Sequence, residues 1–85
     1  MATATPTREE IENKVVETTR ELAGEPELVT LEATFEECDI DSLDLVELAQ
    51  IIQEEYGLDL QAEDVKDVKT VRQAVDVVAE RLTVT

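Results

Sequence analysis

Ser42 is the residue whose surroundings best suit chemistry, because its hydroxyl lies among carboxylates at the expected start of an amphipathic helix. Asp41 is a strong N-cap residue, and Asp44 follows three positions later in a capping-box-like arrangement. Ser42 would then be the first helical residue, with its side chain pointing outward. Unpaired backbone N–H groups and the helix dipole would favour an anion, such as a phosphodiester, beside it. The pattern predicts a modification site, although serine is also common in first turns without any chemistry.

The helix that follows Ser42 carries carboxylates with no basic residue among them, since residues 35–65 contain neither lysine nor arginine. A helix that needs only solubility usually mixes charges of both signs and gains pairs four residues apart. A solvated helix face is the plainer interpretation of these residues. We interpret the one-sign face as a docking strip for basic partner surfaces. Its residues are Asp44, Glu47, Glu54 and Glu55.

Other kinds of chemistry find little support in the sequence. The chain has no histidine, the commonest general base, and its single cysteine cannot form an internal disulfide. We expect Cys38 to be a small buried hydrophobe rather than a reactive thiol. Asp39, Asp41 and Asp44 do not form an EF-hand, because Leu43 replaces a ligand and no glycine follows at the required place. No metal site and no intrinsic catalysis are expected.

The composition limits both the size of the fold and its partners. Eighty-five residues allow one domain with a small core. A net charge of −15, from 22 acidic and 7 basic residues, argues against nucleic acid and anionic membranes and favours basic protein surfaces. The N-terminus does not resemble a signal peptide, and no apolar run is long enough to span a membrane. A reduced, cytoplasmic protein is therefore expected.

Hydrophobic periodicity predicts three main helices. The first opens with a capping box at residues 7–10 and ends at Gly24, which is expected to be its C-cap. The second spans about Ser42 to Tyr56, with Gly57 as a left-handed C-cap, and the last opens with a capping box at residues 70–73. Their expected inward residues are Ile11, Val15, Thr18 or Thr19 and Leu22, then Leu45, Leu48, Ala49 and Ile52, then Val71, Ala74, Val75, Val78 and Leu82.

The remaining segments connect these helices. Residues 25–41 show no sustained helical period and are expected to form a long loop, pinned to the core by Leu28, Leu31, Phe35 and either Cys38 or Ile40. A short helical turn is expected around residues 62–66. The chain is thus predicted to be all-α, an up-and-down four-helix bundle of three main helices plus a short third helix, with the long loop between helices 1 and 2. Residues 1–6 are expected to be a flexible tail and residues 7–85 the domain.

The run Asp41-Ser42-Leu43 followed by Val46-Glu47-Leu48 resembles the phosphopantetheine attachment motif of acyl carrier proteins. The resemblance extends from about residue 7 to residue 82, and it includes Phe35 before the motif and residues 64–71 after it. Two positions depart from the family pattern. Asp39 stands where many members have glycine, and Gln61 where many have proline. Neither departure removes a residue needed for attachment.

The resemblance implies a non-catalytic, discrete carrier that holds acyl groups as thioesters on 4′-phosphopantetheine attached to Ser42, with Asp41 as the adjacent cap. It implies a phosphopantetheinyl transferase as the modifying enzyme. Ketosynthases, acyltransferases and other synthase enzymes with basic docking surfaces would be the partners of a monomeric carrier. Fatty-acid and polyketide biosynthesis both stay open. An aminoacyl or peptidyl carrier is one alternative, and a non-modified acidic protein-interaction module is another.

Overall fold

The computed structural model describes residues 6–82, and within them the chain is helical, as predicted. The elements are α1 (Arg8–Leu22), the 3-10 helix η1 (Pro26–Leu28), α2 (Ser42–Tyr56), α3 (Ala62–Val65) and α4 (Val71–Arg81). In this part of the chain extended pairing is limited to one isolated bridge between Thr34 and Thr70. The predicted all-α bundle with a short third helix is confirmed. Of the tail expected at residues 1–6, all but Pro6 lies outside the described residues.

Each main helix begins at a capping box, in which the N-cap side chain accepts from the N3 backbone and the N3 side chain accepts from the N-cap backbone. The three pairs are Thr7 with Glu10, Asp41 with Asp44, and Thr70 with Gln73. Gly57 ends α2 in the left-handed conformation, at φ 67°. These start and stop signals were predicted correctly because they depend on residues that are close in the sequence.

The end of α1 is formed differently from the expectation. Its C-cap is Ala23 in extended conformation, and Gly24 does not have a positive φ. The predicted glycine C-cap is therefore wrong. Glycine at position 24 instead leaves space for Asp39, because a Cβ atom there would collide with the carboxyl group of Asp39 and force that side chain to move. A contact with a residue distant in the sequence thus explains this glycine.

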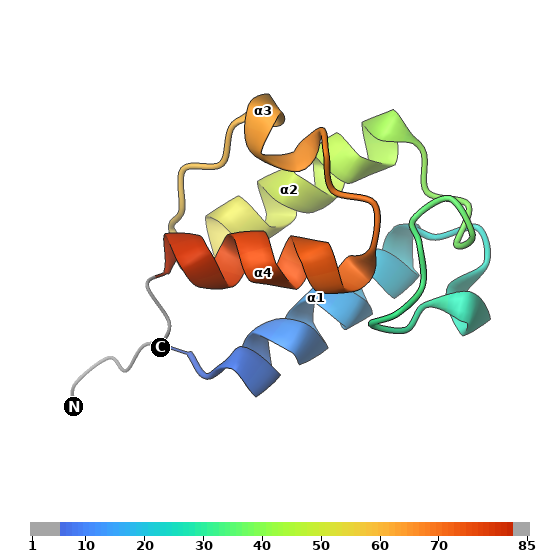
Figure 1. Cartoon of the computed structure of the whole chain (residues 1–85), viewed down its shortest axis with the longest axis horizontal. Coiled ribbons are helices and arrows are strands. Elements are labelled where there is room, and N and C mark those ends of the chain that lie inside the picture. The colour runs from blue at the N-terminus through green and yellow to red at the C-terminus, as the bar shows by residue number, and fades with distance from the viewer. Residues whose placement is uncertain (1–5, 83–85) are drawn as a thin grey trace.

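The main helices pack around α1, which contacts both α2 and α4 (Figure 1). The short helix α3 contacts α2 and α4, whereas no Cα atom of α2 lies within 8 Å of one in α4. Both α2 and α4 run opposite to α1, so α4 does not alternate in direction as an up-and-down bundle would require. The reason is that α3 and its flanking segments return the chain to the end of the bundle where α2 begins (Figure 1).

The long loop is fixed to the core by side chains and by the backbone. Phe35, Cys38 and Ile40 are buried, as expected, and the N–H of Phe35 donates to the carbonyl of Lys69 at 2.9 Å. The expected anchor Leu28 is wrong: it is 49% exposed, and its neighbour Val29 is fully buried instead. The 3-10 turn at Pro26–Leu28 places position 29 rather than 28 toward the core.

Asp39 has φ 61°, a left-handed conformation that favours glycine. We expect Asp39→Gly to relieve this strain and to raise the free energy of unfolding by about 0.5–1 kcal/mol, after allowing for the greater entropy of unfolded glycine. For a domain of this size the melting temperature should rise by about 2–8 °C, measured by circular dichroism. Asp39→Asn is the control, since it removes the charge and keeps the Cβ atom. An equal gain in both variants would show that charge, not backbone strain, is the cause.

Candidate functional site

Ser42 is the first residue of α2, and its side chain is exposed, as predicted. Asp41 precedes it in extended conformation, and its Oδ1 accepts from the N–H of Asp44 at 2.9 Å. The Oδ2 of Asp44 accepts in return from the N–H of Asp41 at 3.3 Å. The two carboxylates therefore fix the first turn of the helix, and Ser42 itself is exposed to solvent.

Two surface hollows meet at Ser42. The larger, about 600 Å³, lies toward the long loop and includes Asp39, Asp41 and Lys69 in its lining. The smaller, about 220 Å³, lies toward α3 and is lined by Ser42, Leu45, Val46, Val65 and Lys66. A flexible group attached to Ser42 therefore has room on either side, and the two routes differ in charge and polarity.

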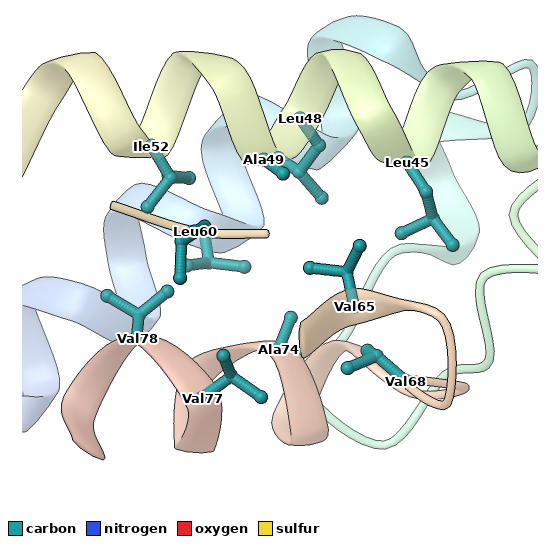
Figure 2. Close-up of a pocket in the computed structure, with 11 residues that line it drawn as sticks. Leu45, Leu48, Ala49, Ile52, Leu60, Val65, Val68, Ala74, Val77 and Val78 are labelled. Carbon is teal, nitrogen blue, oxygen red and sulfur yellow. The ribbon is translucent and has the colours of Figure 1, made fainter. Parts of the chain in front are cut away.

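A small apolar cavity lies between α2, α3 and α4 (Figure 2). Its volume is about 20 Å³, little more than the space of one water molecule. Leu45 and Val65 line both this cavity and the smaller hollow beside Ser42. Every side chain in its lining is a hydrocarbon: Leu45, Leu48, Ala49 and Ile52 of α2, Ala74, Val77 and Val78 of α4, together with Val15, Leu60, Val65 and Val68. Sequence periodicity identified most of these as core residues but did not indicate that they leave a cavity.

The carboxylates expected to form the docking strip do not share one environment. Glu47 and Glu54 are exposed, whereas Asp44 is half-buried and serves in the cap. Glu55 faces α1, where its Oε1 lies 3.4 Å from Nζ of Lys14. Residues 35–65 contain no basic residue, but Lys14 of α1 provides an ion-pair partner for Glu55.

Sequence reasoning missed an apolar component of the same surface. Leu43 is 79% exposed and Val46 44% exposed, and both lie within one turn of Glu47. Residues 43, 47, 50 and 54 follow the three- and four-residue spacing of one helix face, and this spacing is the signal that indicates Leu43 points outward. The outward surface of α2 therefore combines exposed leucine and valine with Glu47 and Glu54.

Cys38 is fully buried, as predicted. Burial raises the pKa of its thiol, and the charge of Glu37 raises it further. A thiol of this kind is protonated near neutral pH and unreactive. Among residues 6–82, no cluster of three or more potential ligands is placed to hold a metal ion.

Comparison with known proteins places this site in a family. A family model described as "Phosphopantetheine attachment site" matches residues 13–78, a segment that includes Ser42 and all of the cavity lining. The chain is 44% identical over 78 residues to an acyl carrier protein of Rubrobacter xylanophilus, covering 89% of this chain and 96% of the relative. This chain belongs to the acyl carrier protein family. It is also 35% identical to the acyl carrier protein of Petrotoga mobilis, over 89% of this chain and 87% of that relative.

Solved structures of acyl carrier proteins share the fold. The acyl carrier protein of Thermotoga maritima superimposes with a TM-score of 0.76 at 30% identity, over 89% of this chain and 91% of that one. The hexanoyl form of the carrier from the actinorhodin polyketide synthase of Streptomyces coelicolor gives a TM-score of 0.68 at 28% identity, over 98% and 96% of the two chains. The helical arrangement is therefore that of the family.

Membership in the acyl carrier protein family establishes the cofactor and the class of activity. The family carries 4′-phosphopantetheine covalently, and its members are carriers rather than enzymes. They interact with synthase enzymes and with a phosphopantetheinyl transferase. The structure fits the group: an exposed hydroxyl, two hollows beside it and an apolar cavity nearby. In residues 6–82 no helix is both long and apolar enough to cross a membrane.

Proposed function

We propose that this protein carries acyl intermediates on 4′-phosphopantetheine attached to Ser42 and delivers them to separate enzymes of fatty-acid or polyketide biosynthesis. The observation that carries this proposal is the placement of Ser42, exposed at the start of α2 and bordering both hollows, within the segment that matches the family. The prosthetic group supplies the thiol that holds acyl groups as thioesters. The chain itself supplies the attachment point, a shelter for the cargo and a surface for partners.

Ser42→Ala tests the attachment site. We expect complete loss of the prosthetic-group mass after incubation with a phosphopantetheinyl transferase and coenzyme A, measured by intact-protein mass spectrometry. The helical circular dichroism spectrum should be nearly unchanged, because Ser42 is exposed and the hydrogen bonds of the cap come from Asp41 and Asp44. Added mass on the variant would place the attachment elsewhere. No added mass on the unaltered protein would favour a non-modified interaction module.

The cavity bears on the kind of cargo. Because its lining has no polar side chain, a methylene chain entering it meets only hydrocarbon, whereas a buried ketone would lose its hydrogen bonds to water without replacement. A cavity of about 20 Å³ must also widen to admit any chain. The lining favours saturated chains, which supports fatty-acid over polyketide biosynthesis as the pathway.

Cargo preference is measurable with matched thioesters. We expect hexanoyl loading on Ser42 to raise the melting temperature by roughly 5 °C or more, since each buried methylene contributes about 0.8 kcal/mol before the work of widening. Loading with 3-oxohexanoyl should give a smaller increase and smaller NMR shifts of the Leu45, Val65 and Val77 methyl groups. Equal increases for both cargoes would contradict the preference for saturated chains.

Partner recognition is proposed to use the outward surface of α2. Glu47 and Glu54 offer charge to basic surfaces, and the adjacent Leu43 and Val46 offer apolar area that a partner can cover. Asp44 and Glu55 also contribute to the negative electrostatic potential of this surface. Asp44 does so while it caps the helix, and Glu55 while it pairs with Lys14. The partners are the transferase, ketosynthases, acyltransferases and other synthase enzymes with basic docking surfaces.

Charge reversal distinguishes a specific surface from overall charge. We expect Glu47→Lys to slow association with the transferase by about 3- to 10-fold at low salt, measured as kcat/KM, and the difference to shrink as salt rises. Glu17→Lys is the matched control, because Glu17 is exposed on α1 and makes no ion pair within residues 6–82. If both variants lose the same rate, net charge alone governs the encounter.

We also propose that residues 7–85 form the carrier domain and that it acts as a monomer in the cytoplasm. A net charge of −15 opposes self-association, and the free thiol of Cys38 suits a reducing compartment.

A further inference from the structure

Most of the seven basic residues are engaged with other parts of the fold. Four of them form ion pairs: Arg8 with Glu12 and Asp76, Lys14 with Glu55, Arg72 with Glu32, and Arg81 with Asp64. Arg20 donates to the carbonyl of Val29 at 3.3 Å. Lys66 and Lys69 remain, and within residues 6–82 neither is within ion-pair distance of a carboxylate.

Both of these lysines lie beside Ser42. They belong to the segment that connects α3 to α4, and each lines one of the two hollows that Ser42 borders. In a chain of charge −15, the cations that are not engaged elsewhere thus flank the one hydroxyl to which an anionic group would be attached. The two hollows, however, treat an anion differently.

The hollow of Lys69 contains Glu36, Asp39 and Asp41 as well. Three carboxylates against one ammonium group make that side unfavourable for an additional negative charge. In the hollow of Lys66 the lysine is the only charged side chain, because the other lining residues are Ser42, Leu45, Val46 and Val65. Electrostatics therefore directs an anion on Ser42 toward Lys66.

The side of Lys66 also leads to the cavity. Leu45 and Val65 line the hollow on one side and the cavity on the other, and both point into the cavity in Figure 2. A group that leaves Ser42 past Lys66 next meets these two side chains. The hollow of Lys69 faces the long loop and also shares two lining residues with the cavity, Leu45 and Val68. Both sides of Ser42 therefore border the cavity lining, and the difference in charge is what distinguishes them.

We propose that Lys66 binds the phosphodiester of the prosthetic group and so directs the arm along the α3 side of Ser42, toward the cavity entrance between Leu45 and Val65. This inference rests on the proposed attachment at Ser42. Lys66 is a positioning residue in this assignment. It holds an anion that is already attached, and it takes no part in forming the thioester.

Lys66→Gln and Lys69→Gln form a matched pair, since both remove one positive charge from the same connecting segment, and each removes it from beside Ser42. Full-length protein is prepared without the prosthetic group and, with transferase and coenzyme A, with it. Mass spectrometry first establishes that Ser42 is fully loaded. The melting temperatures of both forms are then compared at low and high salt, with Lys66→Arg as the charge-retaining variant.

The measured quantity is the change in melting temperature on loading. At low salt we expect this change to be the same in the unaltered protein, Lys69→Gln and Lys66→Arg. In Lys66→Gln it should be lower by roughly 1–6 °C, because one exposed ion pair is lost. High salt should abolish the difference. Comparing loaded with unloaded forms of each variant removes any effect of the substitution on the fold itself.

A second measurement uses the unaltered protein alone. On loading, backbone amide shifts should concentrate at Val46 and Val65, which of the two hollows line only that of Lys66, rather than at Ile40 and Val68, which line only that of Lys69. An equal or larger effect in Lys69→Gln, or shifts concentrated at Ile40 and Val68, overturns the assignment to Lys66. Absence of added mass on Ser42 in the unaltered protein would instead overturn the proposed function, so the two failures are distinguishable.

Discussion

The separation between α2 and α4 is the constraint on which the rest of this structure depends. No Cα atom of one lies within 8 Å of the other, and α1 packs against both from one side only. The opposite side has to be covered by α3 and by the segment that carries Leu60. Hydrocarbon side chains fill the space incompletely and leave a cavity of about 20 Å³. An apolar cavity therefore results from the spacing of the helices.

The position of Ser42 follows from the same arrangement. The long loop carries the chain from the end of α1 to the start of α2, and hydrogen bonds from Phe35 to Lys69 and from Val71 to Ala33 tie it to the start of α4. The beginnings of α2 and α4 thus lie at the same end of the bundle (Figure 1). Ser42 is consequently placed beside the α3–α4 connection, with its lysines, and beside the entrance to the cavity.

Charge is distributed so that ion pairs join different elements. Arg8 links α1 to Asp76 of α4, Lys14 links α1 to Glu55 of α2, and Arg81 links α4 to Asp64 of α3. The Oδ2 of Asp64 also accepts from the N–H of Gln61 at 2.9 Å, and this hydrogen bond, with Arg81, lowers the pKa of the carboxyl group. Such exposed pairs each contribute little to stability. Within residues 6–82 none of these pairs involves Glu47 or Glu54, so the outer face of α2 keeps its negative charge.

The sequence by itself determined the features that depend on neighbouring residues. The capping boxes that begin the three main helices, the left-handed Gly57 and the exposed position of Ser42 involve contacts across three or four positions, which a linear pattern contains. The tertiary structure alone decided the features that join distant residues. Gly24 leaves space for the side chain of Asp39, Glu55 is paired by Lys14, Val29 replaces Leu28 in the core, and Lys66 lies beside Ser42. Periodicity shows which face of a helix is buried, but only the packing of separate elements fixes what that face contacts and where a cavity remains.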